Sequence, residues 1–252
     1  MKVDEIISST KFCHYTNAES IKKIIQNHSF YMSRIDTMND QTERRLHKGE
    51  ERQIFVFSFC HSEAKSIPLF YLYSGIDGKG GRIQYTDSLI RRIIQNGSIH
   101  PVNGYEMDEN NTYAMENYDL FAGWCFYRTG DKGGYYRGIY KERDFYNEFI
   151  KEKGNQYLIK SSYWRYENEF RIVVKFKKPI INERICLCFS KVKTDRGVSV
   201  LWGPELERSE LQKLDKEYRK TQLEYSYMDV FEEEYIRMDL IQRNRKAFEG
   251  LV

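Results

Sequence analysis

The stretch S-S-Y-W-R-Y-E-N-E-F-R-I-V-V, from Ser161 to Val174, constrains the fold more than any other part of the chain. Aromatic and β-branched residues dominate it, which predicts a β-strand. Side chains two apart on a strand share a face, so Glu167, Glu169 and Arg171 are expected to project together, with apolar side chains on the opposite face. Two neighbouring carboxylates repel, and a single arginine relieves that repulsion only partly. Such a group lowers the stability of the fold, and proteins keep destabilising groups of this kind mainly at functional sites. This strand is therefore a candidate site.

Length and charge place the chain among ordinary folded proteins. Its 252 residues suit one large domain, and the 20 tyrosines and 15 phenylalanines supply much of the core material. Forty Lys and Arg against 37 Asp and Glu are close to balance, so charge alone does not argue for nucleic acid or a membrane as partner. Because no apolar run approaches about 18 residues and the N-terminus lacks a signal-peptide core, we expect a cytoplasmic protein without a membrane partner.

The cysteines predict neither a metal site nor disulfides. There are five of them, an odd number, and their spacing matches no metal-binding motif. Small buried apolar residues in a reducing compartment are the expected interpretation. The glycine-rich segment Gly75–Gly81 lacks the strand before and the helix after it that a dinucleotide-binding loop requires, so it predicts a turn.

Short strands and helices alternate along the chain and predict an α+β fold. Strands are expected at 12–16, 30–33, 53–60, 81–85, 135–140, 184–189 and 198–201, and helices at 67–74, 87–95, 143–153, 204–218 and 230–248, with another helix capped by Asn17. Residues 36–43 predict a polar turn or the start of a short helix, and 108–118 a loop. We expect one mixed domain over 1–220, with an insertion at about 95–134, and a C-terminal helical extension over 221–252.

Several motifs, in this order, resemble the bacterial family catalogued as domain of unknown function 2971. They are F-C-H-Y-T at Phe12, M-N-D-Q-T-E at Met38, V-F-S-F at Val56, L-F-Y-L-Y at Leu69, L-I-K-S-S-Y-W-R-Y-E-N-E-F-R-I at Leu158 and V-L-W-G-P at Val200. The block around Trp164 is the specific one. Gln41 stands where the family usually has proline, and Phe70 and Leu72 stand where it usually has tryptophan and histidine.

The order of these motifs is similar to that of ADP-ribosyltransferases. The resemblance implies a split β-sheet core with flanking helices and a helical C-terminus, and NAD as substrate. It implies His14 on the first strand, Tyr73 on a following helix and Glu169 or Glu167 on a late strand as the site. The two glutamates would be catalytic, and the NAD-binding residues would be His14, Tyr15, Ser58, Tyr73 and Arg171.

The chemistry implied by this resemblance is coherent, and alternatives stand beside it. A carboxylate stabilises the positive charge that develops on the ribose, and an aromatic face stacks on nicotinamide. We therefore expect an NAD-dependent ADP-ribosyltransferase or NAD hydrolase, in bacterial defence or a toxin system, with protein, nucleic acid or water as acceptor. One alternative is a non-catalytic nucleotide- or nucleic-acid-sensing module. Another is a metal-dependent nucleic-acid-processing enzyme.

For individual residues, structural roles compete with these functional ones. His14 could be a satisfied structural histidine, Tyr73 a core residue and Ser58 a buried strand hydroxyl. The two glutamates could belong to a cross-strand ladder of ion pairs. The turn that contains Asn39, Asp40 and Glu43 is expected to be a capped turn first and a substrate loop second.

Overall fold

The computed structural model describes most of the chain between residues 11 and 203. The described residues are 11–61, 67–74, 80–104, 106–129, 134–137, 140–141, 149–192, 194, 197–203, 209, 212–213 and 216. The glycine-rich turn at 75–79, most of the helices expected at 143–153 and 204–218, and the extension over 221–252 lie outside these residues.

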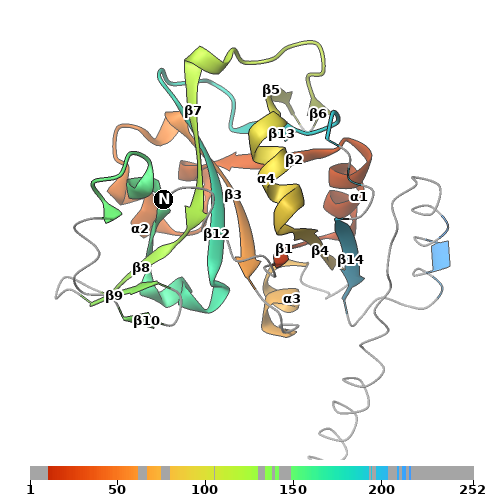
Figure 1. Cartoon of the computed structure of the whole chain (residues 1–252), viewed down its shortest axis with the longest axis horizontal. Coiled ribbons are helices and arrows are strands. Elements are labelled where there is room, and N and C mark those ends of the chain that lie inside the picture. Colours follow the sequence, from red (N-terminus) through yellow and green to blue (C-terminus); the bar gives the residue numbers. More distant parts are fainter. Residues whose placement is uncertain are drawn as a thin grey trace, which may run out of the picture.

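A mixed domain of α-helices and β-strands is confirmed, built on one large antiparallel sheet. The sheet has ten strands, and eight of them follow the order β14-β4-β1-β3-β2-β13-β5-β6, while β12 pairs with β3 and β7 pairs with β12 (Figure 1). The bounds of these strands are β1 Lys11–Thr16, β2 Ser29–Arg34, β3 Ile54–His61, β4 Gly81–Thr86, β5 Ser98–Asn103, β6 Glu106–Met107, β7 Tyr118–Trp124, β12 Glu169–Phe176, β13 Arg184–Cys188 and β14 Val198–Trp202. A second sheet has the order β10-β9-β8-β11, with β8 Phe126–Thr129, β9 Gly134–Arg137, β10 Tyr140–Lys141 and β11 Ile159–Ser161.

The large sheet divides at β3. Strand β12 pairs along β3 from Ile54 to Cys60, so it occupies one edge of β3 over nearly its whole length. The other edge is shared, because β2 pairs with Phe55 and Val56 and β1 pairs with Cys60 and His61. In the described part of the chain, residues 57–59 therefore have no strand on that edge. This opening between β1 and β2 is where the candidate site lies.

Helices and apolar side chains cover the sheet. Helix α1 (Ala18–Gln26) begins at Asn17, whose side chain accepts a hydrogen bond from the backbone N–H of Ser20 at 2.8 Å, as predicted. Helix α4 (Asp87–Asn96) lies across the face of the sheet (Figure 1). Both helices bury their apolar stripes, and burial of such stripes is the main source of helix stability in a folded domain. Helices α2 (Gln41–Leu46) and α3 (Ile67–Tyr73) are short and flank the site. Within the described part of the chain, none of the helices combines the length and the apolar character that spanning a bilayer would require.

The single strand predicted over Ser161–Val174 is wrong in its first half. The chain instead runs through β11, a 3-10 helix η6 (Ser162–Glu167) and then β12, which begins at Glu169. Asn168 joins the two with a left-handed backbone, φ 42° and ψ 60°. Asparagine adopts this conformation more readily than most residues, so the sequence E-N-E permits the break. Glu167 consequently does not share a strand face with Glu169.

Residues 95–134, expected to be an insertion, contribute strands to both sheets. Strand β5 pairs with β13, β7 pairs with β12 along its whole length, and β8 pairs with β11. The loop predicted at 108–118 is present, apart from a short 3-10 helix η4 (Met115–Asn117) and the start of β7. Strand β7 was missed because its sequence, Y-D-L-F-A-G-W, lacks regular alternation, and its side chains are half-buried almost throughout.

Gly154 directs the chain into the site and gives a test of the fold. It has φ 97° and precedes the 3-10 helix η5 (Asn155–Leu158), which leads into β11. A Cβ there would lie 2.2 Å from the ring of Phe121, whereas at Gly104, with φ 64°, a Cβ would meet nothing within 4 Å.

We expect Gly104→Ala to cost about 1 kcal/mol of unfolding free energy, from backbone strain alone. Gly154→Ala should cost about 2 kcal/mol more, because the clash with Phe121 adds to the same strain. Urea denaturation of the two variants and the parent measures the difference. Equal losses at the two positions would contradict the packing described for Gly154.

Candidate functional site

The candidate site is a cavity of about 300 Å³ at the opening of the sheet. Its walls come from β1, β2, β3, α3, β11, η6, the start of β12 and the segment 37–43. The residues that line it are His14, Tyr15, Tyr31, Ser33, Thr37, Met38, Asn39, Asp40, Glu43, Val56, Phe57, Ser58, Cys60, Tyr73, Lys160, Trp164, Glu167 and Glu169. Six of the seven residues predicted for the site are among them, and Arg171 lies directly behind.

Glu169 is the most firmly held group of the site. Its carboxylate accepts hydrogen bonds from the Ser58 hydroxyl, from Lys160 at 2.6 Å and from the Arg171 Nε at 2.6 Å. Its backbone N–H donates to the hydroxyl of Tyr127 at 2.7 Å. Burial on its own would raise the pKa of Glu169, but Arg171 and Lys160 outweigh it and lower this pKa to about 2. Glu169 is therefore a fixed anion at neutral pH.

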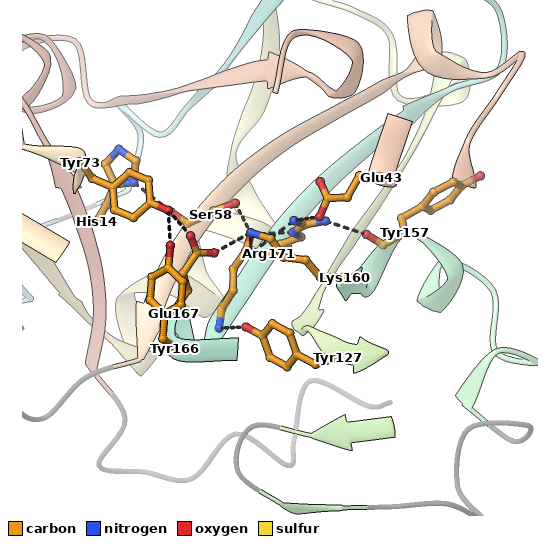
Figure 2. A network of polar contacts seen from close by, with 11 residues as sticks. His14, Glu43, Ser58, Tyr73, Tyr127, Tyr157, Lys160, Tyr166, Glu167 and Arg171 are labelled. Atoms are coloured by element: carbon orange, nitrogen blue, oxygen red, sulfur yellow. Dashed lines mark hydrogen bonds and ion pairs between the residues drawn. The ribbon is translucent and has the colours of Figure 1, made fainter. Parts of the chain in front are cut away.

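Glu167 lies beside it in a different environment. Its carboxylate accepts a hydrogen bond from the Tyr73 hydroxyl and forms an ion pair with the ammonium of Lys160 at 2.5 Å (Figure 2). Burial raises the pKa of Glu167, and Lys160 and the Tyr73 hydroxyl counteract that rise only in part. The two carboxylates therefore differ, because one is kept ionised and the other can take up a proton nearer to neutral pH.

Lys160 connects the two carboxylates and was not predicted as a site residue. Its ammonium lies between Glu167 and Glu169 and 5.0 Å from the ring centre of Trp164. Burial disfavours the ammonium, but the nearby carboxylates outweigh this and raise the pKa of Lys160. A lysine inside the apolar run L-I-K was the available signal, since a buried lysine needs a partner.

Arg171 and Glu43 form the layer behind Glu169. Arg171 is 0% exposed and pairs with Glu169 on one side and with Glu43 on the other. It does not line the cavity, so the structure gives this predicted NAD-binding residue a supporting position. Glu43, on α2, is also fully buried. Its segment, expected first as a capped turn, therefore places this carboxylate inside the protein beside Arg171.

His14 occupies the gap in the edge of β3. Its Nδ1 lies 2.9 Å from the backbone oxygen of Ser58, a carbonyl that has no strand partner on this side in the described chain. Since a carbonyl only accepts, Nδ1 carries the hydrogen. Burial lowers the pKa of His14 to about 4, so the ring is neutral at pH 7 and its Nε2 is an acceptor. The ring also packs against Phe57 at 4.3 Å between centroids.

The remaining predicted residues line the cavity. Tyr73 donates to Glu167, and burial and this hydrogen bond raise its pKa, so it stays a phenol. Tyr15 is nearly buried and packs edge-on against Phe70. Cys60 is no candidate nucleophile, because burial and the two glutamates raise the pKa of its thiol well above the ordinary value.

A second cavity of about 650 Å³ adjoins the first. It shares with the first cavity the residues His14, Tyr31, Ser33 and Phe57. Its other walls include Lys23 and Glu19 of α1, which form an ion pair at 2.9 Å, and Arg184 of β13. The two cavities therefore lie side by side, the first lined by an excess of carboxylates and the second by Lys23, Arg184 and Glu19.

No group of three or more His, Cys, Asp or Glu side chains among the described residues is arranged to hold a metal ion. Between Glu167 and Glu169, the position that a cation would take is occupied by the ammonium of Lys160.

No protein-family model, no curated protein and no solved structure matches this chain. The resemblance to the domain-of-unknown-function family therefore stays a prediction, and the site rests on its own geometry.

Replacement of Lys160 tests the dependence of the carboxylate pair on its ammonium. We expect Lys160→Met to lower the unfolding free energy at pH 7 by about 3–5 kcal/mol, because two buried carboxylates lose their shared partner. Burial raises the pKa of Glu167, so the loss should shrink as the pH falls and this carboxylate takes up a proton. Lys153→Met is the matched control: Lys153 pairs with Asp119 at an exposed position, so about 0–1 kcal/mol is expected. Equal effects of the two substitutions would contradict the arrangement.

The buried histidines predict a pH dependence of stability. Burial lowers the pKa of both His14 and His47 to about 4 from the ordinary value of about 6.5. Between these values the unfolded chain binds more protons than the folded one, so stability falls as the pH drops from about 6.5 to about 4. We expect His14→Gln and His47→Gln each to flatten this decline, as followed by urea unfolding at a series of pH values. Curves parallel to that of the parent would contradict burial of the neutral rings.

Proposed function

We propose that this chain cleaves the bond between nicotinamide and ribose in NAD and transfers ADP-ribose to an acceptor or to water. The observation that carries the proposal is the meeting of His14, Ser58, Tyr73, Glu167 and Glu169 on one cavity, with the two carboxylates in unlike protonation environments. Pairs of titratable groups whose pKa values are pushed apart mark acid–base sites in enzymes.

The charge of the cavity suits a cationic ligand. Four carboxylates line it, from Asp40, Glu43, Glu167 and Glu169, against the one ammonium of Lys160. Aromatic side chains such as Phe57, Tyr73 and Trp164 also line it. Aromatic faces and carboxylates attract positive charge. The nicotinamide ring of NAD is a flat cation, and the ribose becomes positive as the bond to nicotinamide breaks.

Glu169 would supply the electrostatic part of catalysis. Cleavage leaves an oxocarbenium-like ribose, and a carboxylate already fixed in place stabilises that charge without having to reorganise. Ser58, Lys160 and Arg171 hold both carboxylate oxygens in place, and the lowered pKa keeps the group ionised. The nicotinamide leaves as a neutral molecule, so this step needs no proton donor.

Glu167 would act as the general base. Its raised pKa brings it closer to the range in which a carboxylate can accept a proton from water or an acceptor hydroxyl. This assignment divides between two residues the catalytic roles that the sequence suggested for either of them. Tyr73, which donates to Glu167, would orient that carboxylate and present its ring to the nicotinamide.

The adjoining cavity supports a ligand larger than a nucleoside. It has a volume of about 650 Å³, which offers room for the phosphates and the adenosine of a dinucleotide, and Lys23 and Arg184 line it together with Glu19, the ion-pair partner of Lys23. His14 lines both cavities, and its neutral Nε2 can accept a hydrogen bond from a ribose hydroxyl between them. The opening of the sheet at β3 supports the expectation of a split, transferase-like sheet.

One observation favours a second candidate, a non-catalytic nucleotide-sensing module. The Glu169 carboxylate already accepts bonds from Ser58, Lys160 and Arg171, and it is 1% exposed. In such a module the same cavities would bind the nucleotide without breaking it. NAD binding without nicotinamide release would identify this case. The acceptor, and the setting in bacterial defence or a toxin system, stay predictions.

Nicotinamide release tests the proposal and the division of roles. We expect release from NAD by the unsubstituted chain, with a loss of 100-fold or more in kcat for Glu169→Gln, roughly the magnitude seen when one electrostatic contact to a transition state is removed. Glu167→Gln should abolish the acid limb of the pH profile. In Tyr73→Phe this limb should move to higher pH, because the lost hydrogen bond no longer lowers the pKa of Glu167.

Glu116→Gln, at an exposed position in η4, is the matched control and should leave the rate unchanged. If the unsubstituted chain neither releases nicotinamide nor binds NAD in calorimetry, the proposal is overturned. An unchanged pH profile in Tyr73→Phe would remove Glu167 from the role of base.

A further inference from the structure

Glu43 has a carboxylate oxygen that the fold leaves unused. The side chain is 0% exposed. Its Oε1 accepts from Arg171, and its Oε2 has no hydrogen-bond partner among the described residues. A buried polar atom without a partner costs stability, roughly 1–3 kcal/mol, and more for a charged group. Native structures keep such atoms chiefly where a ligand, water or function completes them.

The position of this oxygen indicates what completes it. Glu43 lines the 300 Å³ cavity, together with Asn39 and Asp40 of the same segment. Arg171 bonds to Glu43 and Glu169 at once, so the two carboxylates flank one guanidinium. In Figure 2, Glu43 lies at the end of the network opposite Tyr73. A ligand group that meets Glu43 is therefore a neighbour of the atoms beside Glu169, on the side away from Tyr73.

We propose that Glu43 is a ligand-binding residue whose Oε2 accepts a hydrogen bond from a hydroxyl of the ribose that loses nicotinamide. This inference rests on the proposed function. With the anomeric carbon beside Glu169 and nicotinamide against Tyr73, the 2′- and 3′-hydroxyls of that ribose are the nearest donors on the Glu43 side. A carboxylate only accepts, so it selects a donor, and a hydroxyl fits the acidic wall better than a phosphate does.

Burial raises the pKa of Glu43, and Arg171 and Lys160 counteract the rise. Arg171 donates to Oε1, which favours the ionised form next to it. A hydrogen bond from a ligand hydroxyl to Oε2 would favour the same form. Ligand binding and ionisation of Glu43 are therefore expected to support each other.

A cycle of substitutions and ligand analogues tests the contact. The analogues are NAD that lacks the 2′- or the 3′-hydroxyl on the nicotinamide ribose. All proteins carry Glu169→Gln, the substitution expected to slow nicotinamide release by 100-fold or more, so that the ligand survives a calorimetric titration. Glu43→Gln keeps an oxygen for Arg171, which places the amide NH₂ where Oε2 was. Glu116→Gln serves as the matched control.

With Glu43 present, one of the two analogues should bind about tenfold or more weakly than NAD, as expected for a lost hydrogen bond to a charged group. With Glu43→Gln, NAD itself should bind about tenfold more weakly, and the analogue should bind within about threefold of NAD. A residue with a structural role only would weaken NAD and the analogues alike. If Glu43→Gln does not fold, Glu43→Asp, which keeps the charge but withdraws the oxygen, should lose the same discrimination.

The outcomes separate the two proposals. Equal discrimination against the deoxy analogues with and without Glu43 overturns this inference and leaves the proposed function standing. Absence of both NAD binding and nicotinamide release in the unsubstituted chain overturns the proposed function, and the ribose contact with it.

Discussion

The ammonium of Lys160 is the interaction on which the rest of the site depends. Two adjacent buried carboxylates repel each other unless a proton or a cation lies between them, and here Lys160 is 2.5 Å from Glu167 and 2.6 Å from Glu169. The three side chains come from a strand, a 3-10 helix and a second strand within ten residues of chain. The path of the chain over these ten residues therefore determines whether the ion pairs can form. The left-handed backbone at Asn168 places Glu167 beside Glu169.

The division of the sheet makes room for this cluster. A continuous antiparallel sheet would pair the backbone of residues 57–59 with a neighbouring strand and leave no cavity. Here β1 and β2 separate along β3, and the side chain of His14 supplies the hydrogen bond that the carbonyl of Ser58 would otherwise receive from a strand. This carbonyl is satisfied, as nearly all buried backbone groups are, and a ligand-sized space remains beside it. Figure 1 shows β3 and β12 side by side at the centre of the sheet.

Local patterns predicted much of the fold and part of the site. The strands β1, β3, β4 and β13, the cap at Asn17 and the aromatic helix α3 follow from alternation, capping chemistry and apolar spacing, all of which act over a few residues. Strand β7 was not predicted, because its partly buried side chains do not alternate between apolar and polar residues. Lys160 was not predicted, and Glu43 was placed in a substrate loop only as the second choice, because the roles of both depend on their partners: Glu43 pairs with Arg171, 128 positions later in the chain. No short-range pattern carries that information. The break at Asn168 was readable in principle, since asparagine is the residue that tolerates it.

The charge balance of the cluster favours a ligand-binding or catalytic role over a purely structural one. A structural network of buried ions is most stable when its charges cancel and every polar atom is bonded. Here three carboxylates, from Glu43, Glu167 and Glu169, face the two cations Lys160 and Arg171. Charge neutrality requires one further positive charge. Because the pKa is raised for Glu43 and Glu167 but lowered for Glu169, that charge can be a proton on either of the first two, or a cation in the cavity that all three carboxylates line. A site that can exchange a proton for a positive ligand suits the proposed cleavage of NAD, whereas a purely structural network would gain nothing from the surplus.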